Sequence, residues 1–259
     1  MPDPSLRTLL DVAIEAAYLA GRRTLAYFNT GIAVETKLDD TPVTCADREA
    51  EQVIRSVIGR YFPSHSILGE EAGQTDGDPR FRWIIDPIDG TKSFIHGVPL
   101  YAVLIGMELD QRPSLGVIYL PALDEIVYAA AGLGCRWNGR AATVSTVQQL
   151  EQATVLTSSA LTAIRRSDAF ERLAGRARLS RTWGDAYGYA LVATGRAEIM
   201  LDPVINPWDI SPMLPILSEA GGRFSDWKGT VTTWGPDAVA TNAALYDQVI
   251  AVLRSEQRR

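Results

Sequence analysis

Two aspartates, Asp86 and Asp89, follow the apolar run 83–85 in the first half of the chain. Carboxylates are the usual protein ligands of hard divalent cations, and the proline between these two stiffens the loop. Gly90 lets the backbone approach a ligand closely, and free N–H groups in such a turn can hold an anion. A cation site beside an anion cradle, with the hydroxyl of Thr91 next to it, predicts a hydrolase of phosphate esters. Taken alone, the pair fits an ordinary turn after a strand equally well.

Further acids come next to two other apolar stretches. Glu70 and Glu71 follow the short run 66–68, which is expected to be a strand. Because two strand ends can meet at one edge of a sheet, these acids can lie beside the first pair. Asp209 precedes the apolar stretch 210–220 and is expected at a helix N-terminus, where the dipole and capping favour a carboxylate. Capping alone would also explain Asp209.

Two helices are expected to come before the first strands. The spacing of apolar residues predicts helices over residues 5–28 and 45–60. Ser5 is expected to cap the first helix. Thr44, with Asp47 three residues later, predicts a capping box at the start of the second.

The remaining elements are expected to form two differently built halves. Consecutive β-type runs separated by turn residues predict an antiparallel meander, and after residue 150 strands and helices alternate. The meander strands are expected at 101–109, 114–119, 126–130 and 134–137. The later strands are expected at 155–157, 179–182, 199–201 and 239–241, with helices ending near 174, at 187–194, at 210–220 and up to 254.

Composition excludes several classes of protein. The 259 residues carry a net charge of −6, and no Lys/Arg cluster is dense enough to suggest a nucleic-acid surface. No apolar run approaches the roughly 18 residues of a membrane span, and the N-terminus does not resemble a signal peptide. We therefore expect a cytoplasmic protein with no membrane partner.

Cysteine and histidine are too scarce for a zinc site. Cys45 and Cys135 lack metal-ligand spacing and are expected to be buried free thiols in a reducing compartment. His65 and His96 are expected to be structural or exposed.

Taken together, these motifs resemble the inositol monophosphatase family, which are lithium-sensitive, Mg-dependent phosphatases. The matching segments are Thr44-Cys45-Ala46-Asp47, Gly69-Glu70-Glu71, the run from Trp83 to Thr91, Trp208-Asp209, and Glu219-Ala220-Gly221-Gly222. The resemblance implies a layered α-β-α-β-α sandwich of mixed α+β and α/β character. It also implies a single phosphatase domain over 1–259, with helices and an antiparallel sheet to about 140 and an α/β half from about 150. It further implies a homodimer.

The same resemblance implies roles at matching positions. Glu70, Asp86 and the carbonyl of Ile88 would hold one Mg²⁺, and Asp86, Asp89 and Asp209 a second. Glu70 would also place a third, weaker ion or the attacking water, and Mn²⁺ is an alternative metal. Thr91 would activate the water, with Asp47 accepting the hydroxyl proton. Residues expected to contact the phosphate ester are Glu70, Ile88, Asp89, Gly90, Thr91, Asp185, Asp202 and Asp209. Lys37 would either reach the metal site or remain a solvated loop residue, and Glu71 is expected to support the ligands rather than bind metal.

The segment 183–198 carries information on the substrate. It looks like the histidinol-phosphate phosphatase branch, which acts in histidine biosynthesis. Asp185 and Asp202 would face the amine and imidazole of L-histidinol phosphate, although Asp185 also fits a helix cap. The alternatives are an inositol-1-monophosphatase, a nucleotide 3′-phosphatase, or a catalytically silent relative with a regulatory or RNA-associated role.

Overall fold

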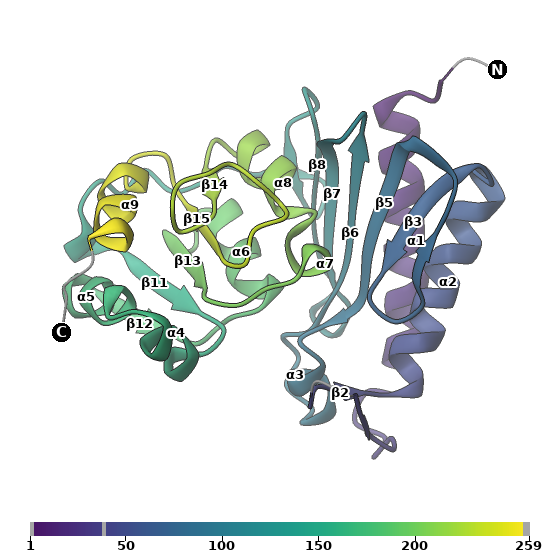
Figure 1. The fold of residues 1–259 in the computed structure, drawn as a ribbon, viewed down its shortest axis with the longest axis horizontal. Coiled ribbons are helices and arrows are strands. Elements are labelled where there is room, and N and C mark those ends of the chain that lie inside the picture. The colour runs from purple at the N-terminus through teal and green to yellow at the C-terminus, as the bar shows by residue number, and fades with distance from the viewer. Residues whose placement is uncertain (1–2, 38–39, 256–259) are drawn as a thin grey trace.

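The computed structural model describes residues 3–37 and 40–255, and it has five layers (Figure 1). Two long helices cover one face of a large sheet, and a layer of helices separates that sheet from a smaller one. A last group of helices covers the outer face of the small sheet. This is the predicted α-β-α-β-α sandwich, so the expected fold class is confirmed.

The large sheet has eight strands in the order β10-β9-β8-β7-β6-β5-β3-β4. All neighbours pair antiparallel except β3 and β5, which run parallel. The predicted meander is thus confirmed as β6 to β9. The strands are β3 (His65–Gly69), β4 (Gly73–Thr75), β5 (Asp78–Asp89), β6 (Ala102–Leu109), β7 (Arg112–Leu120), β8 (Glu125–Ala130), β9 (Cys135–Trp137) and β10 (Arg140–Ala141).

Helices α1 (Leu6–Leu25) and α2 (Cys45–Tyr61) form the first layer. Ser5 caps α1 through its hydroxyl, and Thr44 and Asp47 form a capping box at the start of α2, as predicted. Between these helices the short strands β1 (Glu35–Thr36) and β2 (Pro42–Val43) pair with each other. The apolar faces of α1 and α2 pack against the large sheet and bury a cluster that includes Leu9, Ile54 and Trp83 of β5.

The small sheet has the order β12-β11-β13-β15-β14 and mixes parallel and antiparallel pairs. Helices α6, α7 and α8 lie between the two sheets, while α5 and α9 pack on the outer face. The strands are β11 (Thr154–Thr157), β12 (Leu179–Arg181), β13 (Ile199–Asp202), β14 (Arg223–Ser225) and β15 (Ala238–Thr241). The helices are α3 (Thr91–Ile95), α4 (Ala160–Arg166), α5 (Ala169–Arg176), α6 (Ala186–Ala193), α7 (Pro207–Ile210), α8 (Met213–Glu219) and α9 (Tyr246–Arg254), with single 3₁₀ turns at Pro121–Leu123 and Leu150–Gln152.

Two predicted helices are each divided in the structure. The helix expected over 210–220 is split into α7 and α8 at Ser211-Pro212, because proline cannot donate a backbone hydrogen bond within a helix. The helix ending near 174 is split into α4 and α5 at Ser167, whose hydroxyl accepts a hydrogen bond from the N–H of Ala169 at 3.1 Å. Such a local bond competes with helix continuation.

The expectation for the cysteines was half right. Cys135 is buried, but Cys45 is exposed at the first position of α2. Among the described helices, none combines the length and apolar character that crossing a membrane requires.

Candidate active site

The parallel pair β3 and β5 brings the first acids together. Gly69 lies opposite Ile85 in this pair, so Glu70 and Asp86 follow at the same edge. Contrary to the prediction, β5 does not end in a turn at Asp86 but continues to Asp89. A bulge lies between the two aspartates, because Asp86 and Asp89 pair with residues only two apart on β6, Leu104 and Ala102. The extra residue places both carboxylates on one face of the sheet, where regular alternation would have separated them.

The turn expected after β5 begins at Gly90. Its φ of 81° lies in the left-handed region, which glycine adopts without a steric penalty. A side chain here would also approach Asp185, since a Cβ would lie 3.0 Å from its Oδ2 atom. Glycine at position 90 therefore allows the turn after which α3 begins at Thr91, and it leaves the cavity open at this point.

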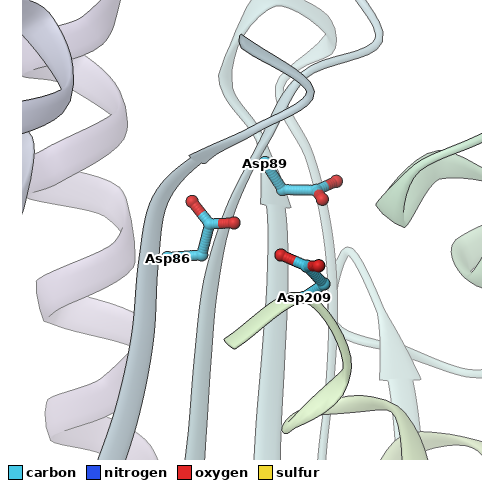
Figure 2. A group of neighbouring side chains, drawn as sticks. All are labelled: Asp86, Asp89 and Asp209. Atoms are coloured by element: carbon cyan, nitrogen blue, oxygen red, sulfur yellow. The ribbon is translucent and has the colours of Figure 1, made fainter. Parts of the chain in front are cut away.

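Helix α7 supplies a third acid from the other side. Asp209 lies in its first turn, as expected, and its Oδ2 atom accepts a hydrogen bond from the N–H of Asn206 at 2.7 Å. Asp86, Asp89 and Asp209 each contribute one carboxylate oxygen to a group whose members lie within 4.8 Å of one another (Figure 2). The structure thus joins residues more than 100 positions apart into one cluster.

Each acid of this cluster is held in the same way. One oxygen of Asp86 accepts from the N–H of Ile88 at 2.9 Å, and one of Asp89 accepts from the N–H of Ala186 at 2.6 Å. Asp209 uses one oxygen on Asn206 in the same manner. In Figure 2 the carboxylates point toward a common space. Backbone amides therefore orient three hard oxygen ligands and leave lone pairs for a cation, which fits Mg²⁺ or Mn²⁺.

Burial makes the ionised form of this cluster costly without a cation. Burial, with Glu70 and the neighbouring aspartates adding repulsion, raises the pKa of Asp86 well above its usual range. The pKa of Asp89 is likewise raised by burial and by Asp185. Burial raises the pKa of Asp209 to about 7. A divalent cation would reverse this balance by favouring the charged carboxylates.

The metal-free protein is therefore expected to lose stability as the pH rises. A carboxyl with a raised folded pKa stabilises the protein fully below its unfolded pKa of about 3.9, and this stabilisation disappears as the pH passes the folded pKa. For Asp209 the loss of stability ends near pH 7.

Asp209→Asn tests this expectation, because the variant keeps the acceptor for the N–H of Asn206 but cannot ionise. In EDTA its melting temperature should exceed that of the wild type at pH 8, and should depend less on pH between 5 and 8. Asp11→Asn, on the exposed face of α1, should change neither the melting temperature at pH 8 nor its dependence on pH. An Asp209→Asn protein that melts below the wild type at pH 8 would contradict the argument.

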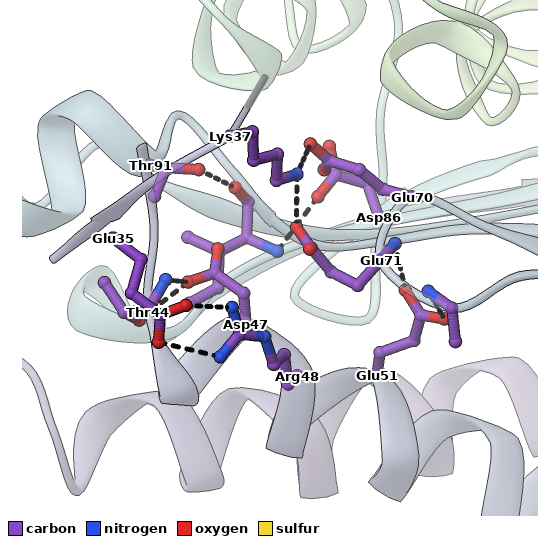
Figure 3. Close-up of polar contacts among 12 residues, drawn as sticks. Glu35, Lys37, Thr44, Asp47, Arg48, Glu51, Glu70, Glu71, Asp86 and Thr91 are labelled. Atoms are coloured by element: carbon purple, nitrogen blue, oxygen red, sulfur yellow. Dashed lines mark hydrogen bonds and ion pairs between the residues drawn. The ribbon is translucent and has the colours of Figure 1, made fainter. Parts of the chain in front are cut away.

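Of the two expectations for Lys37, contact with the acidic site agrees with the structure, and a solvated loop position does not. Its Nζ atom donates to Glu70 at 2.8 Å and to Glu71 at 2.6 Å (Figure 3). Burial alone would lower the pKa of Lys37, but the hydrogen bonds to the two glutamates raise it, so the side chain remains a cation. Glu71 thus contacts Lys37, and its role in supporting the metal ligands stays a prediction.

The hydroxyl expected to activate water has a different partner from the one predicted. Thr91 donates to the carbonyl of Ile88 at 3.1 Å. Asp47, only 1% exposed, accepts from the N–H and the hydroxyl of Thr44 at 2.8 and 2.7 Å. Figure 3 shows both arrangements. A proton path from Thr91 to Asp47 stays a prediction, since each group is engaged elsewhere in this conformation.

A cavity of about 630 Å³ is lined by Asp185 together with Glu70, Asp86, Asp89, Thr91 and Asp209. Asp185 precedes α6 with φ 52° and ψ −154°, a strained conformation for a non-glycine residue, and its side chain makes no capping hydrogen bond. Asp185 therefore occupies the N-cap position of α6, as the alternative expected, but its side chain does not cap the helix. Burial raises the pKa of Asp185, although the positive charge of Lys92 opposes the shift.

Asp202 does not line this larger cavity. It borders a smaller space of about 60 Å³, and the residue is 4% exposed. Ser158 donates to one oxygen and Tyr189 to the other, the latter at 2.8 Å. Burial raises the pKa of Asp202 to about 6.

Sequence reasoning missed the groups that hold the acids. The N–H groups of Ala186 and Asn206 and the hydroxyls of Ser158 and Tyr189 carry no motif of their own. His65, in contrast, is structural as expected: its ring stacks on Phe62 and Phe81.

Comparison with known proteins agrees with the geometry. The model of the inositol monophosphatase family matches residues 5–258. The chain is 42% identical to a histidinol-phosphatase of Chlorobaculum parvum, over 96% of this chain and 98% of that protein. It is 38% identical to a histidinol-phosphatase of Mycobacterium tuberculosis, with coverages of 86% and 89%. A fructose-1,6-bisphosphatase/inositol-1-monophosphatase of Aquifex aeolicus is 33% identical, with coverages of 96% and 97%.

Among solved structures, the extragenic suppressor protein suhB of Bartonella henselae superposes with a TM-score of 0.90 at 29% identity. The match covers 96% of this chain and 99% of that one. Because the family model spans nearly the whole chain and the relatives match it end to end, the chain belongs to the inositol monophosphatase family.

Proposed function

We propose that this protein is a magnesium-dependent phosphatase that hydrolyses L-histidinol phosphate to L-histidinol and phosphate, in histidine biosynthesis. The main support is the arrangement of acids around one cavity. Asp86, Asp89 and Asp209 form a cluster suited to cations, and Asp185 lines the same cavity without belonging to that cluster. The similarity to histidinol-phosphatases supports the same substrate.

The oxygen ligands suggest where the ions would bind. The three clustered aspartates, together with Glu70 and the carbonyl of Ile88, would hold two or three Mg²⁺ ions. The carbonyl of Ile88 already accepts the hydroxyl of Thr91, but a carbonyl oxygen has a second lone pair. Bound ions would stabilise the negative charge that develops on the phosphate and leaving oxygens.

The chain itself would orient the phosphate and the water. The N–H groups of Gly90 and Thr91 begin α3, where first-turn amides lack partners within the helix, so they can bind phosphate oxygens. The hydroxyl of Thr91 would orient the attacking water. A hydroxyl is a weak base, so Asp47 would have to accept its proton after a rotation of the Thr91 side chain.

The organic half of the substrate would meet a carboxylate. L-histidinol phosphate carries an amine and an imidazole, and either can be positive. Because both oxygens of Asp202 already accept hydrogen bonds, we assign the direct contact to Asp185. Asp202 would add negative charge behind it. A cation bound there would also relieve the cost of burying ionised Asp185.

Replacing Asp185 should therefore affect a cationic substrate most. Losing one partner of a charge-assisted hydrogen bond costs about 1.5–3 kcal/mol. At about 1.4 kcal/mol per tenfold change, Asp185→Asn should lower kcat/KM for histidinol phosphate by roughly 10- to 150-fold. The kcat/KM for inositol 1-phosphate, which carries no cation, should hardly change. Equal losses on both substrates would show that Asp185 serves only the scaffold.

A phosphate-release assay separates the alternatives. The wild type would be tested on histidinol phosphate, inositol 1-phosphate, fructose 1,6-bisphosphate and adenosine 3′,5′-bisphosphate. A preference for inositol 1-phosphate would favour an inositol-1-monophosphatase, and one for the bisphosphorylated nucleotide a 3′-phosphatase. No release from any of them would favour a silent relative with a regulatory or RNA-associated role.

A further inference from the structure

A buried glutamate on α2 contacts the segment that carries Glu70. The carboxylate of Glu51 is 1% exposed and lies one turn after Asp47. It accepts hydrogen bonds from the N–H of Glu71 at 2.8 Å and from the N–H of Ala72 at 3.0 Å. These are the two residues that follow Glu70, and Figure 3 shows the carboxylate of Glu51 next to Glu71.

Arg55 completes the attachment from the next turn of the helix. Its Nε atom donates to Glu51 at 2.7 Å, and the other guanidinium nitrogens donate to the carbonyl of Gly73 at 2.5 Å and the hydroxyl of Thr75 at 2.9 Å. The turn between β3 and β4 is thus held through its N–H groups by Glu51 and through β4 by Arg55.

The fit at this attachment is close. A Cβ added to Gly69 would collide with the Oε1 atom of Glu51 and with the guanidinium of Arg55. Glycine at this position therefore allows the helix to contact the backbone directly. A buried ion pair is weak evidence for stability, because desolvation offsets its attraction. Accurate placement of the turn is the better explanation for keeping one here.

We propose that Glu51 is a positioning residue for the metal site, which holds Glu70 in place by fixing the amides that follow it. This inference rests on the proposed metal-dependent function, but not on the identity of the substrate. The role is distinct from the proton transfer proposed for Asp47, because Glu51 holds the segment that follows Glu70, whereas Asp47 contacts Thr44.

Glu51→Gln tests the proposal with little change of shape. The amide keeps one acceptor for the two N–H groups and loses the ion pair. Partners of metal ligands typically contribute 10- to 100-fold to metal affinity. Isothermal titration with Mg²⁺ alone should show affinity about 10- to 100-fold weaker than in the wild type. Glu49→Gln is the matched control on the same helix: it contacts Arg23 and Tyr27, and Mg²⁺ affinity should be unchanged.

A double-mutant cycle shows whether the effect passes through Glu70. In a Glu70→Gln background, Glu51→Gln should cause little further loss of Mg²⁺ affinity, because the ligand it positions is gone. Full additivity of the two losses would overturn the proposal. Should Glu51→Gln fail to fold, Glu51→Asp keeps the charge but shortens the side chain by one methylene group, which withdraws the carboxylate from the N–H groups of Glu71 and Ala72. Its Mg²⁺ affinity should be about tenfold weaker than that of the wild type, and unchanged affinity would overturn the proposal equally.

Two failures can be told apart. A wild type that does not bind Mg²⁺ would overturn both the metal-dependent function and the role of Glu51. A wild type that binds Mg²⁺, with Glu51→Gln binding equally well, would overturn the role of Glu51 alone.

Discussion

Asp86→Asn is expected to lower kcat at least about 10³-fold while the protein keeps its fold. The asparagine oxygen can still accept the N–H of Ile88, which lies 2.9 Å from the aspartate in the wild type. The second oxygen becomes an NH₂ group, which cannot bind a cation. Metal ions contribute several kcal/mol of transition-state stabilisation, and about 1.4 kcal/mol corresponds to a tenfold change in rate. Asp86 is the residue expected to contact more than one ion, so its loss should be the most damaging.

Steady-state kinetics and Mg²⁺ titration measure this effect together. Removing a buried carboxylate should also raise the thermal stability of the metal-free protein, so lost activity cannot be ascribed to unfolding. Asp124→Asn makes the same replacement at an exposed carboxylate beside Tyr119 and should leave both measurements unchanged. Near-native activity of Asp86→Asn at ordinary Mg²⁺ concentrations would refute a metal site built on this residue.

The main acids of the site could be predicted because each follows a strong local pattern. Glu70 and Asp86 come after apolar β-type runs, and β3 and β5 do pair in parallel with the two acids at one edge. Asp209 precedes an apolar helix, and it does lie in the first turn of α7. Position relative to a regular element is a local property, and therefore it can be read from the residues.

The orientation of these acids could not be predicted in the same way. Regular alternation places residues three apart on opposite faces of a strand, and only the bulge after Asp86 brings Asp89 to the same face. The N–H of Ala186, which holds Asp89, is 97 residues away in the chain. The strained backbone of Asp185 likewise depends on its surroundings rather than on its residue type.

The same distinction applies to the fold. The long helices α1 and α2 and the meander were predictable, because apolar spacing repeats over many residues. Strands of three residues were predicted unevenly, because so short a run shows little of a period of two: β9 and β12 were predicted, whereas β4 and β14 were missed. The exposed Cys45 was also missed: the residue type favours burial, but the position at the start of α2 decides its exposure.

Thr91→Ala is expected to lower kcat by on the order of 10²–10⁴, the usual contribution of a positioned proton-transfer group. In the structure the hydroxyl donates to the carbonyl of Ile88, and alanine removes it without adding volume. The KM for histidinol phosphate should change far less, because the backbone N–H groups of Gly90 and Thr91 remain. Steady-state kinetics at saturating Mg²⁺ measure the two constants separately.

Thr91→Ser provides the matched comparison, because it keeps the hydroxyl and loses only the methyl group. If the hydroxyl orients and helps to deprotonate water, the serine variant should retain most of kcat while the alanine variant does not. Both variants remove the methyl group, so equal losses would assign the effect to packing around α3. A rise in KM with kcat unchanged would instead mean that Thr91 binds the phosphate and takes no part in the proton transfer, and Asp47 would then act only as the capping partner of Thr44.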